Sequence, residues 1–178
     1  MFNKIKKTVL LSLIILSLSA YGQSKPKWVK IGEGTYKSGF TYPYKVQLSV
    51  PYGVRNIAEL KQGLLPMRFE LIWLPNTTTK KEIKKLFSNQ LEEKFASVES
   101  FKLSKNLIHL FLRKLPETKR HEHWVFEYYP DVGTKLFIKD EKVYHLVGAQ
   151  INRALIDSWI NKSPVLTANL FNRLLKLQ

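Results

Sequence analysis

The sequence predicts an α+β fold in which a large antiparallel sheet is covered on one face by helices. Two observations support this prediction. Short runs rich in β-branched and aromatic residues lie on both sides of a central helical segment, and more helical sequence follows the last of these runs. Each predicted helix has one apolar stripe and one charged face, so each helix can cover a sheet with one side only.

Residues 1–22 have the features of a secretory signal peptide. Lys4, Lys6 and Lys7 precede an apolar run over residues 9–18, and the small residues Ala20 and Gly22 offer cleavage sites. The run is shorter than the roughly 20 residues that a membrane span needs. We expect cleavage before residue 23, leaving residues 23–178 as one periplasmic or secreted domain. Cleavage after Ala20 and a retained anchor are the alternatives.

The composition limits the possible functions. The chain contains no cysteine, which excludes disulfides, thiolate metal sites, cysteine nucleophiles and a lipid-modified cysteine anchor. The formal charge is +15, and removal of residues 1–22 takes away three lysines and lowers it to +12. Such a charge favours anionic partners such as lipid headgroups or acidic small molecules, whereas nucleic acid is not expected for an exported protein. The densest group of lysines, at residues 80, 81, 84 and 85, is interpreted as a solvated helix face.

The first half of the chain reads mainly as strands. Residues 28–31 and 35–37 are predicted as short strands around Gly32 and Gly34, and residues 56–64 as a short helix. Residues 42–50 alternate strictly, with Tyr44, Val46 and the apolar residues after them on one face. Residues 67–74 form a second clear strand.

The central segment begins with a helix. Thr79 and Glu82 match a capping box, and the apolar stripe that follows consists of Ile83, Leu86, Phe87, Leu91 and Phe95. This predicts a helix from residue 80 to about residue 98, followed by a short helix over residues 98–105. Residues 107–115, 124–129, 134–139 and 143–147 are then predicted as strands.

The C-terminal third is predicted as a hairpin and two helices. Residues 140–142 form the expected turn between the last two strands. Apolar side chains at Ile151, Ala154, Leu155 and Trp159 predict a helix over residues 150–162. Ser163 and Pro164 then provide the start of a leucine-striped helix.

Motifs for catalysis or metal binding are missing from the sequence. It has no nucleophile elbow, phosphate-binding glycine loop or zinc-protease motif. His121 and His123 would share a strand face, but no third ligand of suitable geometry lies close in sequence, so we interpret them as part of a polar turn. His109 is interpreted as a structural histidine in an apolar strand. We therefore predict no catalytic residue, metal or cofactor, and whether the protein is an enzyme stays open.

The aromatic residues favour a packed core, with a ligand cleft as the alternative. Most of them lie at strand and helix periods, which is typical of core residues. Alternatively, some line a cleft between sheet and helices that holds an apolar ligand, with a basic or phenolic group at its mouth.

The order of segments from Gly32 to Leu175 resembles the chalcone isomerase-like family, particularly its secreted bacterial branch. The resemblance rests on the Gly32–Gly34 turn with the strand after it, on residues 69–75 before the capped helix, on residues 129–136, and on residues 159–164. It implies an open-faced β-sandwich with a ligand cleft between a large antiparallel sheet and a helical layer.

The resemblance does not extend to the isomerase residues. The family's arginine position falls near Gly34 or Thr35, its threonine position near Val46 and its tyrosine position near Lys81. Without cationic and hydroxyl groups at these places, isomerisation loses its electrostatic assistance. The resemblance therefore implies a non-catalytic protein.

Other members of the family bind fatty acids through an arginine and a tyrosine. The candidate ligand-binding residues in this sequence are Tyr44, Arg68, Trp73, Lys81, Arg113 and Tyr128. We expect an exported, monomeric binder of a fatty acid or another apolar or acidic ligand. The alternatives are an isomerase or lyase of divergent chemistry in the same cleft, and an interaction module that contacts an anionic membrane surface or a partner protein.

Overall fold

A computed structural model describes residues 26–95 and 98–160, so residues 1–22 and the predicted helix after Pro164 lie outside the described residues. Within the described ranges, no helix combines the length and apolar character that a membrane crossing requires. The elements are β1 (Trp28–Ser38), β2 (Thr41–Pro51), α1 (Ile57–Lys61), β3 (Met67–Trp73), β4 (Thr77–Thr78), α2 (Lys80–Glu92), α3 (Val98–Lys114), β5 (Thr118–Lys119), β6 (His123–Tyr129), β7 (Gly133–Ile138), β8 (Glu141–Leu146) and α4 (Ala149–Ile160).

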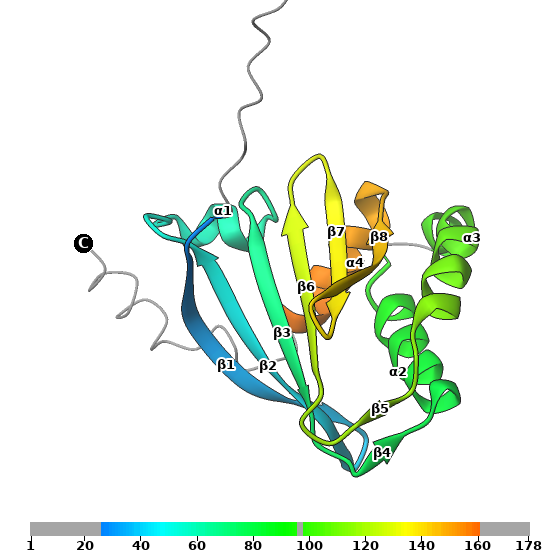
Figure 1. Cartoon of the computed structure of the whole chain (residues 1–178). Coiled ribbons are helices and arrows are strands. Elements are labelled where there is room, and N and C mark those ends of the chain that lie inside the picture. The colour runs from blue at the N-terminus through cyan, green and yellow to red at the C-terminus, as the bar shows by residue number, and fades with distance from the viewer. Residues whose placement is uncertain (1–25, 96–97, 161–178) are drawn as a thin grey trace, which may run out of the picture.

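Six strands form one antiparallel sheet in the order β1-β2-β3-β6-β7-β8 (Figure 1). Each pair of neighbours is also consecutive in the chain, except β3 and β6, which are separated by α2 and α3. The strand β4 before α2 and the strand β5 after α3 pair with each other as a separate two-stranded ribbon. The α1 end of the sheet and the β4–β5 end are opposite ends of the molecule.

The alternation of apolar residues decides which face of the sheet is buried. In β3, Met67, Phe69, Leu71 and Trp73 are completely buried, whereas the residues between them are partly exposed. The same alternation in β2 buries Tyr44, Val46, Leu48 and Val50. Both strands were predicted with these faces.

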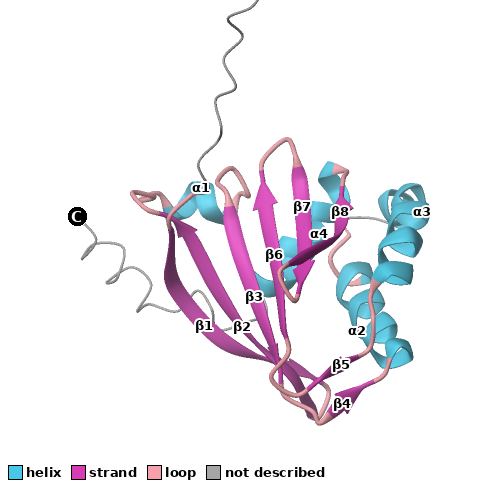
Figure 2. Ribbon diagram, in the orientation of Figure 1, coloured by secondary structure: helices cyan, strands magenta, loops and turns pink. Residues whose placement is uncertain are grey.

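The helices α2, α3 and α4 lie together on one side of the sheet (Figure 2). The stripe predicted for α4 is buried, and Asn152, Ile156, Ser158 and Ile160 are buried as well. The ring of Trp159 lies 4.8 Å from that of Phe69 and 4.9 Å from that of Phe126, centroid to centroid. The predicted α+β architecture, a large antiparallel sheet with a helical layer, is therefore confirmed.

Helix α2 begins at the predicted capping box. The Thr79 backbone N–H donates to Glu82 Oε2 at 2.8 Å, and the Glu82 N–H donates to Thr79 Oγ1 at 3.3 Å. Both groups would otherwise lack partners in the first turn. The helix ends at Glu92, earlier than predicted.

The predicted strand over residues 107–115 is wrong, because these residues continue α3 to Lys114. A short apolar run fits a buried strand as well as a helix. The buried residues Ser104, Ile108, Phe111 and Leu115 are three or four positions apart, which is helical spacing. His109, predicted as a structural histidine in a strand, is consequently an exposed residue of α3.

Two turns also differ from the prediction. Residues 28–38 form one continuous strand, in which the register shifts between Lys30 and Gly32. The turn between β7 and β8 is formed by Lys139 and Asp140, whose φ angles are 53° and 65°, so β8 already begins at Glu141. Two successive residues with positive φ are typical of a tight two-residue hairpin turn.

Candidate ligand-binding site

A pocket of about 570 Å³ opens at the α1 end of the sheet. Its walls come from the turn after α1, the β6–β7 hairpin, and the start of α4 with the loop before it. This volume is in the range that small-molecule sites have. The lining residues are Gln62, Gly63, Leu64, Tyr128, Pro130, Asp131, Val132, Gly133, Val147, Gly148, Ala149, Asn152 and Arg153.

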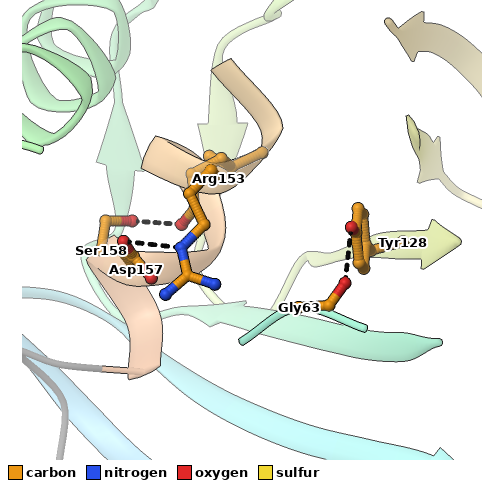
Figure 3. Close-up of polar contacts among 6 residues, drawn as sticks. Gly63, Tyr128, Arg153, Asp157 and Ser158 are labelled. Carbon is orange, nitrogen blue, oxygen red and sulfur yellow. Dashed lines mark hydrogen bonds and ion pairs between the residues drawn. The ribbon is translucent and has the colours of Figure 1, made fainter. Parts of the chain in front are cut away.

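Tyr128 and Arg153 both line this pocket, and each has its polar end near Gly63 (Figure 3). The hydroxyl of Tyr128 donates to the carbonyl oxygen of Gly63 at 2.8 Å. A Cβ atom placed on Gly63 would lie 3.5 Å from Arg153 Nη1 and 3.6 Å from Tyr128 Oη. These are ordinary contact distances, so the backbone φ of 72°, and not lack of space, favours glycine at this turn.

The guanidinium of Arg153 has one occupied edge and one available edge. Its Nε donates to Asp157 Oδ2 at 3.0 Å, one helical turn further along α4. Its terminal Nη groups donate no hydrogen bond to any described residue. A guanidinium edge with two parallel N–H groups is the donor that recognises a carboxylate or phosphate in a bidentate manner.

The phenol of Tyr128 stays protonated at neutral pH. Partial burial raises its pKa above the usual value, the nearby Asp131 carboxylate raises the pKa further, and the charge of Arg153 opposes both effects. Tyr128 is therefore a neutral hydrogen-bonding group beside the cation. Asp131 lines the same pocket but is exposed to solvent, which screens its charge.

Asn152 holds the floor of the pocket in place. Its Oδ1 accepts a hydrogen bond from Thr134 Oγ1, and its Nδ2 donates to the carbonyl oxygens of Leu146 at 3.0 Å and Gly148 at 2.8 Å. The side chain is 3% exposed. One buried amide thus ties α4 to β7 and to the end of β8. It thereby fixes the position of the next residue of α4, Arg153, relative to the sheet.

The rim of the pocket is apolar. Leu64, Val132 and Val147 line it and are 57%, 47% and 48% exposed, respectively. Each comes from a different wall of the pocket. A pocket that is lined by an arginine and a tyrosine and has an apolar rim suits a ligand with an anionic head and an apolar body.

The fold can be compared with known proteins. No family model matches the sequence, and no curated protein matches it. Among solved structures, the crystal structure of the Arabidopsis thaliana fatty-acid binding protein AtFAP1 is similar, with a TM-score of 0.64 over 84% of this chain and 89% of that chain, at 12% sequence identity. The chain has the chalcone isomerase-like fold.

Within the chalcone isomerase-like fold, the positions that correspond to the isomerase residues lie on three elements, β1, β2 and α2. Gly34 and Val46 face each other directly in the β1–β2 register. Lys81 is exposed in the first turn of α2. The arginine and threonine positions of the resemblance are thus neighbours across two strands, but here they are a glycine and a valine.

Of the six candidate ligand-binding residues, Tyr128 alone lines the 570 Å³ pocket. Tyr44 and Trp73 are fully buried in the core, where their ring centroids are 5.5 Å apart. The Tyr44 hydroxyl accepts hydrogen bonds from Gln90 Nε2 at 2.7 Å and Trp159 Nε1 at 3.0 Å. The structure therefore places both residues in the packing between sheet and helices, and neither lines the 570 Å³ pocket.

The three predicted cations lie on three different elements, β3, α2 and α3. Arg68 lies between buried residues of β3 and therefore points to the face opposite the helices. Lys81 is at the start of α2 and Arg113 is exposed in the last turn of α3. The structure does not bring them together with Tyr128.

Sequence reasoning missed Arg153. An arginine four residues before an aspartate on a helix is typical of an exposed ion pair, and Arg153 does form that pair with Asp157. Its place in the pocket depends on the turn after α1, which is 90 residues earlier in the chain. The available signal was that Arg153 follows the β6–β7 hairpin, which carries Tyr128, closely in the sequence.

Of the two histidines of the predicted polar turn, His121 precedes β6 and His123 is the first residue of β6. His121 has a φ of 64° in the turn, and His123 Nδ1 lies 2.7 Å from Glu70 Oε1. Among residues 26–95 and 98–160, no group of three or more histidine and acidic side chains is placed to hold a metal ion.

Proposed function

We propose that the protein binds an amphiphile of the fatty-acid class without catalysing a reaction, in the pocket that Tyr128 and Arg153 share. The observation that carries this proposal is the convergence of the two side chains on Gly63, with the Nη edge of Arg153 free of described partners. The similar fold of AtFAP1, a fatty-acid binding protein, supports it.

In this proposal the ligand carboxylate accepts hydrogen bonds from the Nη groups of Arg153. The Tyr128 hydroxyl, which donates to Gly63 in the free protein, rotates to add a third hydrogen bond. Leu64, Val132 and Val147 contact the methylene groups next to the carboxylate. Desolvation of the apolar chain then supplies most of the binding free energy, and the arginine selects the head group.

Titration of the purified protein with palmitate, followed by calorimetry, tests the proposal. We expect saturable binding, and Arg153→Gln should weaken it roughly 10- to 150-fold, because a charge-assisted hydrogen bond contributes about 1.5–3 kcal/mol. The control is Arg113→Gln, which removes another exposed arginine, from the end of α3. Hexadecanol, which has the chain without the carboxylate, should bind equally to wild type and Arg153→Gln.

Two results would contradict this site. One is an equal loss of palmitate affinity in Arg113→Gln and Arg153→Gln. The other is the same affinity ratio between palmitate and hexadecanol in wild type and Arg153→Gln. Absence of saturable palmitate binding to the wild type would remove the fatty-acid proposal altogether.

The proposal includes export of the protein, as a member of the secreted bacterial branch of chalcone isomerase-like proteins. The lysines, apolar run and small residues within positions 1–22 support it. N-terminal sequencing of the protein isolated from the periplasmic fraction should begin at Tyr21 or Gln23. Recovery of an intact Met1 terminus in the cytoplasmic fraction would contradict export.

A further inference from the structure

The end of the molecule opposite the ligand pocket has an exposed aromatic tip. The β1–β2 hairpin turns at Gly39 and Phe40, and Gly39 has a φ of 58°. Phe40 is fully exposed and Tyr42 is 53% exposed. A phenylalanine without any burial contributes nothing to the folded core, so at this projecting turn it is available for a contact outside the molecule.

Two other segments that carry cations lie next to this tip. Ser38 and Thr41 of the hairpin line a depression of about 280 Å³ together with Thr77, Thr78 and Lys85. The β4–β5 ribbon then brings residues 117–120 to residues 77–79. We use the term basic end for residues 37–42, 77–85 and 117–120, which lie together at the β4–β5 end of the sheet (Figure 1).

The basic end has a large excess of positive charge. Its cations are Lys37, Lys80, Lys81, Lys84, Lys85, Lys119 and Arg120. None of these seven forms an ion pair with a described residue. The acids on the same segments are Glu82, which is held in the capping box, and Glu117.

We propose that the basic end docks onto an anionic phospholipid bilayer, with Phe40 inserted at the boundary between headgroups and acyl chains. Lysines near an anionic leaflet attract it additively, and exposed aromatic side chains partition into the interfacial region. A bilayer provides both a negative surface and an apolar phase behind it. A soluble polyanion would contact the lysines and leave Phe40 in water.

The docking surface is independent of the proposed fatty-acid function. The pocket of Tyr128 and Arg153 lies beside α1, at the opposite end of the sheet from β4 and β5 (Figure 1). A molecule docked by its basic end therefore keeps that pocket open to water. Loss of docking should leave palmitate affinity unchanged, so failure of one proposal does not imply failure of the other.

Co-sedimentation with vesicles tests the docking. The protein as isolated from its host cells should bind vesicles of phosphatidylcholine with added phosphatidylglycerol, fail to bind phosphatidylcholine alone, and dissociate at high salt. Lys80→Gln/Lys81→Gln should weaken binding about 30-fold and flatten its salt dependence. Phe40→Ser should weaken binding at every salt concentration without changing the salt slope.

Matched controls use other parts of the surface. Leu64→Ser removes an exposed apolar side chain at the opposite end, and Lys102→Gln/Lys105→Gln removes two exposed lysines from α3. Both should bind vesicles as the wild type does. Equal loss in the control and test variants overturns the proposal, and so does binding that depends on Lys80 and Lys81 but not on Phe40.

Discussion

The indole Nε1 of Trp159 donates a hydrogen bond to the hydroxyl oxygen of Tyr44 at 3.0 Å, across 115 residues of sequence. The same oxygen accepts from Gln90 Nε2 at 2.7 Å. One phenol thereby joins β2 to both α2 and α4 inside the core. Burial strongly raises the pKa of Tyr44, so the group stays neutral at all ordinary pH values.

Replacement of Tyr44 by phenylalanine should therefore destabilise the protein without changing its shape. Tyr44→Phe leaves two buried N–H donors without their acceptor, and we expect a loss of about 3 kcal/mol in the free energy of unfolding. Urea denaturation followed by tryptophan fluorescence measures it. Tyr42→Phe, the same change at an exposed position, should stay within about 0.5 kcal/mol of the wild type. Equal stability of the two variants would show that the hydrogen bonds contribute nothing.

Loss of the Asn152 amide should loosen the pocket floor as well as the fold. Asn152→Ala removes the partner of the Thr134 hydroxyl and of two carbonyl oxygens, for an expected cost of about 2–4 kcal/mol. Asn106→Ala, at an exposed site of α3, is the control. Hydrogen exchange should show faster opening at the start of α4 in Asn152→Ala. Unchanged exchange there would mean that the amide does not fix the helix.

Gly133 should tolerate no side chain. A Cβ atom at this position would collide with the carbonyl oxygen of Leu146, and the φ of 104° is unfavourable for any other residue. Gly53 has a φ of 88° but has nothing within 4 Å of the added atom. Gly53→Ala should therefore cost about 1–2 kcal/mol from backbone strain alone, and Gly133→Ala distinctly more. Urea midpoints in the reverse order would contradict this difference.

The capping box predicts a pH dependence of stability. Hydrogen bonds from the Thr79 side chain and backbone lower the pKa of Glu82 in the folded protein. Its contribution is therefore complete above the unfolded pKa of about 4.3 and is lost as the pH falls through the lower folded pKa. The urea midpoint of wild type should exceed that of Glu82→Gln at pH 7, and the two should converge in strong acid. A gap that does not change with pH would exclude the carboxylate as its source.

Most of the sheet could be predicted because its strands alternate strictly. Residues 67–73 and 42–50 carry their apolar side chains on one face, and no other secondary structure buries such a pattern. The first half of α3 was predicted as a short helix over residues 98–105. Its second half could not be predicted, since residues 107–112 form a nearly continuous apolar run that does not distinguish a helical period from a strand period. The two-residue turn at Lys139 and Asp140 was missed because neither residue is a glycine.

The pocket was harder to predict than the fold. Tyr128 was named as a ligand-binding residue because the resemblance implies a tyrosine that holds a fatty-acid carboxylate, and it does line the pocket. Arg153 becomes its neighbour only through the docking of α4 and the turn at Gly63. Such convergence is a property of tertiary packing and leaves no periodic signal along the chain.

The order of strands divides the sheet into two three-stranded meanders that meet only where β3 pairs with β6. The chain leaves the sheet after β3, forms α2 and α3, and returns to the sheet at β6. Pairing of β4 with β5 holds the start and the end of this helical segment together. Lengthening this helical segment would change the register of no strand pair in a hairpin. The entropic cost of closing a longer loop also grows only slowly with its length. The segment between α2 and α3 is therefore where a new element, such as an engineered reporter domain, could be inserted while the pocket of Tyr128 and Arg153 stays assembled.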